Sequence, residues 1–127
     1  MTDPVEPVAG AAELIERMLQ EVFNEPDPER RATAIAEVFS ADVVFTDPER
    51  TVRGRDDLAE AVTGLLAQGP GFRFTHAGPY RGVGDLGMRA WALGPPGGEP
   101  VLHGLDVAVV TDNEISALWT MLGPDDS

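Results

Sequence analysis

The first half of the chain carries helical stripes of apolar residues on either side of one short strand. Over residues 11–24 the apolar side chains recur at intervals of three and four, which is typical of a helix with one buried face. Asp27 and Pro28 suit an N-cap and a first helical position, and a second helix is expected to end near Ser40. The run Val43–Asp47 indicates a strand.

In the second half, the pattern of apolar and polar positions predicts one more helix and then only strands. A short strand over residues 51–53 and a helix over residues 55–68 are predicted first. Four strands then follow, separated by glycine, proline and Asp-Asn turns; they are expected at residues 72–80, 86–93, 101–111 and 115–122. Helices followed by an antiparallel meander indicate an α+β fold whose sheet curls around a pocket.

Two aspartates interrupt strands that are otherwise apolar. Asp47 ends a strand in which it shares one face with Val43 and Phe45, and Asp106 lies in the middle of the long strand at 101–111. Burial disfavours the charged form of a carboxyl and raises its pKa toward values useful for proton transfer. Two other interpretations stay open: Asp47 is a turn residue, or Asp106 faces outward.

Charge and composition exclude several classes of function. The chain has 127 residues and a net charge of −13, which argues against binding to nucleic acids or to anionic membranes. It has no cysteine, so disulfides and thiolate chemistry are ruled out, and its two histidines, His76 and His103, are too far apart in sequence to predict a metal site. No apolar run approaches the about 20 residues of a membrane span, and the acidic, proline-rich start is unlike a signal peptide, so a cytoplasmic location is expected.

Four segments resemble the nuclear transport factor 2-like superfamily, and within it the SnoaL-like polyketide cyclase and ketosteroid isomerase group. They are Ala41–Pro48, Gly54–Leu58, Ala90-Trp91 and Gly104–Val107. The resemblance covers residues 11–122, with residues 1–10 and 123–127 expected to be flexible ends. It implies a cone-shaped, curved sheet with three helices enclosing a hydrophobic pocket (a cystatin-like α+β roll), and a homodimer.

The resemblance also implies roles for particular residues. In such isomerases the aspartate of an Asp-Pro pair is the general base, which matches Asp47, and a protonated aspartate on the penultimate strand matches Asp106. The first-helix tyrosine of the isomerases has no equivalent here, since Met18 stands nearest its place and Tyr80 is the chain's only tyrosine. Arg89 would complete an Asp-Arg-Asp set like that of the limonene epoxide hydrolase branch, or would lie on the surface.

The expected function follows from these residues and from the resemblance. We expect cofactor-independent acid/base chemistry, isomerisation or ring closure, on a small hydrophobic carbonyl compound, with no metal. Non-catalytic binding of an apolar ligand, an accessory role as a dimer, and epoxide hydrolysis are the alternatives. The expected pocket walls, which core packing would explain equally well, are Phe45, Met18, Phe74, Tyr80, Trp91 and Trp119.

Overall fold

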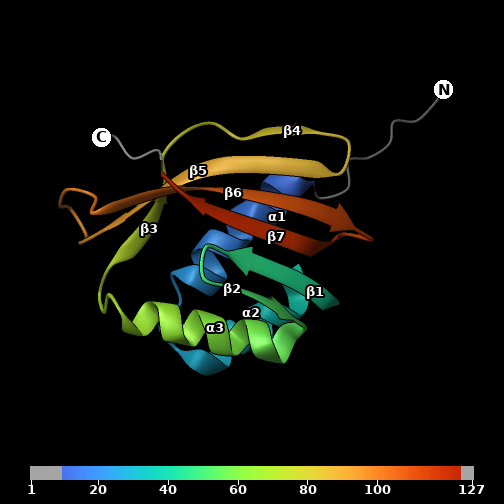
Figure 1. Cartoon of the computed structure of the whole chain (residues 1–127), viewed down its shortest axis with the longest axis horizontal. Coiled ribbons are helices and arrows are strands. Elements are labelled where there is room, and N and C mark those ends of the chain that lie inside the picture. The colour runs from blue at the N-terminus through green and yellow to red at the C-terminus, as the bar shows by residue number, and fades with distance from the viewer. Residues whose placement is uncertain (1–9, 124–127) are drawn as a thin grey trace.

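Three helical segments lie on one side of a curved sheet in the computed structural model, which describes residues 10–123 (Figure 1). The first is α1 (Ala11–Arg17), which continues directly into the π-helix η1 (Met18–Phe23); α2 (Pro28–Val38) and α3 (Arg55–Ala67) follow. The capping expected for α2 is confirmed, because the Asp27 side chain accepts a hydrogen bond from the Arg30 N–H and Pro28 opens the helix.

Seven strands form one sheet, in the order β2-β1-β7-β6-β5-β3, with β4 also paired to β5. Their bounds are β1 Phe39–Asp47, β2 Arg50–Arg53, β3 Arg73–His76, β4 Arg81–Val83, β5 Leu86–Gly94, β6 Leu102–Thr111 and β7 Glu114–Leu122. The α+β class and the curved, open sheet are as expected. One pair departs from the antiparallel pattern: β1 runs parallel to β7, so the sheet is mixed.

The strand expected over residues 72–80 is two strands separated by a bulge. Residues 77–80 stand opposite only Arg89 and Ala90 of β5, since His76 pairs with Trp91 and Arg81 pairs with Met88. The interruption falls at Gly78-Pro79, where proline has no N–H for the ladder. The polypeptide resumes pairing in β4 on the far side of the bulge.

The core lies between the helices and the concave face of the sheet. Inward-pointing residues on neighbouring strands are fully buried, among them Phe39, Phe45, Ala108 and Leu118, and η1 supplies Met18 from the helical side. Most residues of the opposite, convex face are partly or fully exposed, with Trp119 at 40% and the small Ala92 an exception at 6%. Within residues 10–123, no helix is long and apolar enough to cross a membrane. The expected flexible ends fall almost wholly on residues 1–9 and 124–127, which lie outside the described residues.

Candidate functional site

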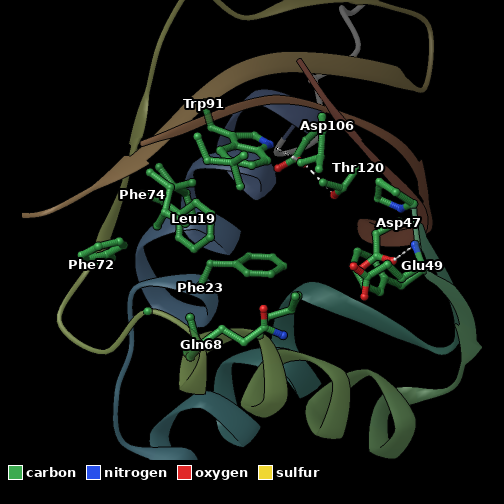
Figure 2. A pocket seen from close by; sticks show the side chains of 18 of the residues that line it. Leu19, Phe23, Asp47, Glu49, Gln68, Phe72, Phe74, Trp91, Asp106 and Thr120 are labelled. Atoms are coloured by element: carbon green, nitrogen blue, oxygen red, sulfur yellow. Dashed lines mark hydrogen bonds between the residues drawn. The ribbon is translucent and has the colours of Figure 1, made fainter. Parts of the chain in front are cut away.

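A cavity of about 360 Å³ opens between η1, α3 and the concave face of the sheet (Figure 2). Most of the side chains around it are apolar or aromatic, a composition typical of sites for small molecules. The apolar set comprises Leu19, Phe23, Phe45, Leu65, Leu66, Phe72, Phe74, Trp91, Leu93, Val101, Leu102 and Leu122. Pro48 and Gly69 also line the cavity, and six polar residues complete the wall: Asp47, Glu49, Arg50, Gln68, Asp106 and Thr120.

Asp106 lines this cavity from the middle of β6 and is 6% exposed. Its side chain shares the inward face with its buried neighbours Gly104 and Ala108, so the alternative in which Asp106 faces outward is wrong. Burial raises the pKa of the carboxyl from 3.8 to about 6, against the effect of two hydrogen bonds, from Thr120 and Trp91, that lower it. Asp106 therefore changes its charge near neutral pH.

The two hydrogen bonds to Asp106 come from the strands on either side of it. Trp91 of β5 donates its indole N–H to Oδ1 at 3.0 Å, and Thr120 of β7 donates its hydroxyl to the same oxygen at 2.8 Å. Thr120 is the direct cross-strand partner of Asp106, and Trp91 pairs with Gly104, two residues away along β6. Figure 2 shows both donors pointing at the carboxyl above the cavity.

Asp47 also lines the cavity, but its carboxyl holds a turn. Its Oδ1 accepts the backbone N–H groups of Glu49 at 2.8 Å and Arg50 at 3.0 Å, and its Oδ2 lies 3.5 Å from an Arg50 guanidinium nitrogen. The side chain is 7% exposed. The turn interpretation of Asp47 therefore describes its hydrogen bonds, and the same residue still faces the cavity from the end of β1.

Arg89 does not bridge the two aspartates, which corrects the expectation of an Asp-Arg-Asp set. It shares the inward face with Trp91, but its Nε donates to the Gly78 carbonyl at 2.9 Å and Nη1 lies 3.8 Å from Glu16 of α1. Helix α1 covers this end of the sheet, so the side chain is held there instead of entering the cavity. Among residues 10–123, the structure records no ion pair between Arg89 and Asp47 or Asp106.

Three of the six expected wall residues line the cavity. Phe45 and Trp91 project from β1 and β5, and Phe74 of β3 packs edge-on against Trp91 with ring centroids 5.2 Å apart. The other three do not line the cavity, for distinct reasons. Met18 is fully buried in the core cluster, and Tyr80 follows the Gly78-Pro79 bulge and packs over Gly82 and Gly87.

Trp119 lies on the convex face, because a bulge changes the facing of β7. The Asp112-Asn113 hairpin pairs Thr111 with Glu114, a register that would place Trp119 opposite Asp106. The register shifts by one residue at Ser116, so Thr120 takes that place and Trp119 turns outward. Thr120 was missed for the same reason, since alternation counted from the turn assigns it to the wrong face.

Three further wall residues were not expected from the sequence: Leu19 and Phe23 of η1, and Gln68 beyond α3. Leu19 and Phe23 belong to the apolar stripe of residues 11–24, so periodicity marked them as buried without separating cavity from core.

The two histidines lie apart, with His76 bonded to Glu16 at 2.6 Å and His103 exposed. No group of three or more potential metal ligands occurs in the described part of the chain.

A family model for the SnoaL-like domain matches residues 15–118, which span the site and most of the fold. The chain belongs to the SnoaL-like family. A search of curated proteins finds no match. Among solved structures, a candidate isomerase of the SnoaL-like family from Agrobacterium tumefaciens str. C58 superposes with a TM-score of 0.83 at 26% identity, covering 88% of this chain and 96% of that one.

Two more distant structures share the fold. A candidate SnoaL-like polyketide cyclase from Jannaschia sp. CCS1 superposes with a TM-score of 0.77 at 13% identity, covering 96% of this chain and 91% of that one. A candidate ketosteroid isomerase from Kribbella flavida DSM 17836 reaches 0.65 at 17% identity, covering 90% and 78%. At these identities the likeness establishes the architecture, and the activity has to be argued from the site.

Proposed function

We propose that this SnoaL-like protein binds a small, largely apolar carbonyl compound and catalyses cofactor-independent proton transfer on it, in an isomerisation or a ring closure. Asp106 is the acid/base group. The observation that carries the proposal is a buried carboxyl on the wall of a mainly apolar cavity, where burial raises its pKa to about 6. A group with that pKa is present in both protonation states near neutral pH, which general acid/base catalysis requires.

The charges around the cavity favour a neutral ligand. Asp47, Glu49 and Asp106 carry the carboxyl groups of the wall, and Arg50 is its only cationic side chain among the described residues. Arg50 is already paired, 3.5 Å from Asp47 and 3.1 Å from Glu49. An anionic ligand would therefore meet uncompensated negative charge. Asp47 is the proposed second carboxylate of the reaction.

Exchange of a carbon-bound proton tests this proposal without knowledge of the natural substrate. The probe is 2-tetralone, a neutral bicyclic ketone, and NMR follows deuterium incorporation next to its carbonyl in D₂O. We expect the protein to accelerate exchange, with a rate that rises with pH and levels off above about 6 as Asp106 becomes a base. Asp106→Asn should lose about a hundredfold of the acceleration.

A matched control separates the site from the general effect of removing a charge. Asp85 is an exposed carboxylate on a turn outside the cavity, so Asp85→Asn should exchange 2-tetralone like the wild type. Equal rates in the wild type and in Asp106→Asn would refute the catalytic proposal. If the ketone then still bound, as seen by chemical-shift changes, the chain would be assigned to non-catalytic ligand binding.

We also propose that two copies associate through the convex face of the sheet. Trp119 is 40% exposed and Met121 is 47% exposed there, and register places Val107 and Leu105 beside them. The central outward positions, paired from Thr46 through Trp119 and Val107 to Met88, carry no carboxylate in a chain of net charge −13. Glu114 lies apart from them at the turn between β6 and β7, and Arg53, Arg73 and Arg81 lie toward the edges of the sheet.

Sedimentation tests the association. We expect a dimer for the wild type and a monomer for the double variant Trp119→Ser/Met121→Ser. The control Val101→Ser removes an apolar side chain that is 61% exposed at the cavity, and it should stay dimeric. A wild-type monomer at micromolar concentration would overturn the proposed association of two copies.

A cytoplasmic location stays a prediction.

A further inference from the structure

Both hydrogen bonds to Asp106 end on one of its two oxygens. Trp91 and Thr120 donate to Oδ1, and the described residues supply no donor to Oδ2. Yet among the described residues no polar side-chain atom that is fully buried lacks a hydrogen-bond partner, so Oδ2 cannot be fully buried. Since Asp106 lines the cavity, Oδ2 is the oxygen that is open to it. The two oxygens of this carboxyl are therefore chemically distinct before any ligand arrives.

Gly104 makes this arrangement sterically feasible. It is the cross-strand partner of Trp91, and a Cβ at this position would overlap Cζ2 of the indole and stand 2.6 Å from the Met121 carbonyl oxygen. The indole therefore lies directly across β6 where residue 104 has no side chain. This brings its N–H to the carboxyl two residues further along that strand. Any larger residue would displace the ring and its N–H together.

The donors decide where the proton resides. An indole N–H can only donate, so Oδ1 must present a lone pair to Trp91 in both protonation states of Asp106. A second lone pair of Oδ1 receives the Thr120 hydroxyl. With both pairs engaged, Oδ1 is the carbonyl oxygen of the neutral acid, and the acid proton is on Oδ2.

We propose that Gly104, Trp91 and Thr120 are positioning residues that confine the exchangeable proton of Asp106 to Oδ2, the oxygen facing the cavity. When Asp106 is neutral, the Oδ2 hydroxyl donates to an acceptor oxygen of the ligand. When Asp106 is ionised, Oδ2 accepts the proton of an acidic C–H group of the ligand. This inference rests on the proposed function for its ligand, while the arrangement of the carboxyl can be tested without one.

The first test follows the ¹³C resonance of the Asp106 carboxyl through a pH titration. Trp91→Phe keeps the ring and removes the N–H, and Thr120→Val keeps the shape and removes the hydroxyl. Each lost bond stabilised the ionised form, so each variant should raise the titration midpoint by roughly one pH unit, and the double variant by more. An unchanged or lowered midpoint in both single variants would overturn the inference.

A double-mutant cycle tests the role of Gly104 separately. Gly104→Ala should raise the midpoint in the wild-type background, but not in a Trp91→Ala background, where no indole has to move. Gly87→Ala is the control, because its Cβ would stand 2.6 Å from the Tyr80 hydroxyl and 2.8 Å from Ala11, in a similarly tight place away from the carboxyl. It should lower thermal stability and leave the midpoint unchanged. A Gly104→Ala shift that persists without Trp91 would contradict the role assigned to this glycine.

The ketone assay adds a readout that distinguishes the two proposals. If the wild type exchanges 2-tetralone through Asp106, Trp91→Phe/Thr120→Val should lower kcat by about tenfold at little change in KM, because a proton shared between both oxygens is misplaced half of the time and the carboxyl is less firmly held. A normal kcat in this folded variant would refute the positioning role in catalysis. If the wild type itself does not exchange the ketone, the proposed function fails while the titration results still judge the arrangement.

Discussion

The burial of Asp106 makes the folding stability of this protein depend on pH in a way that Asp106→Asn removes. The pKa of the carboxyl is about 6 in the folded chain, against a reference value of 3.8 that applies to the unfolded chain. The folded state thus holds the proton more tightly than the unfolded state. Its stabilising effect is complete below pH 3.8 and is lost as the pH rises through 6.

The size of the effect follows from the distance between the two pKa values. At about 1.4 kcal/mol per pH unit the full difference is worth about 3 kcal/mol, and most of this falls between pH 4 and pH 7. Asparagine keeps an Oδ1 that accepts from Trp91 and Thr120, so the variant removes the ionisation with little change in those bonds.

Urea unfolding at a series of pH values measures this contribution of Asp106 to the folding stability. The free energy of unfolding of Asp106→Asn minus that of the wild type should increase by roughly 2 to 3 kcal/mol from pH 4 to pH 7. Other titrating groups contribute equally to both proteins and cancel in the difference. A difference that stays flat across this range would refute the reasoning, because Asp106 would then ionise in the folded state as it does in water. A decrease would mean that its two donors outweigh its burial.

Three further substitutions test neighbouring parts of the account. Asn24→Ala removes a side chain that bonds both backbone groups of Phe74, at 2.8 Å each, and should lower the free energy of unfolding by about 2 kcal/mol in urea; no loss would show that water replaces it. Arg89→Leu should leave ketone exchange within about twofold, because its charge contacts Glu16 and Gly78 outside the cavity, whereas lost exchange in a folded variant would restore the Asp-Arg-Asp hypothesis. Gly54→Ala should reduce stability by about 1 to 3 kcal/mol in thermal or urea unfolding, since φ is 92° there, and an unchanged midpoint would contradict the strain.

Much of the fold could be predicted from the sequence, because its signals are local. Apolar periodicity, the Asp27-Pro28 cap and the two-residue turn at Asp112-Asn113, both with positive φ, each depend on a few neighbouring residues. The inward facing of Asp106 followed from strand alternation together with the resemblance to a family. The parallel pairing of β1 with β7 could not be derived this way, since it joins strands from opposite ends of the chain.

The site was harder to predict, because single-residue shifts decide which side chains reach it. The bulge at Ser116 exchanges Trp119 for Thr120 opposite Asp106, and nothing in the alternation of β7 announces it. The Gly78-Pro79 bulge likewise separates Tyr80 from Phe74, although the sequence favoured one continuous strand. Arg89 does point inward, but the position of Glu16 on α1, a contact distant in sequence, determines where its charge goes.

The proposed chemistry requires a carboxyl at the wall of an apolar cavity to exchange its proton near neutral pH, and the pKa of Asp106 in the wild-type protein measures this. A ¹³C titration of the carboxyl, assigned by the resonance missing in Asp106→Asn, should have its midpoint at about 6 and should shift when 2-tetralone is added. A midpoint at or below about 4, the ordinary value for an aspartate in water, would contradict the account.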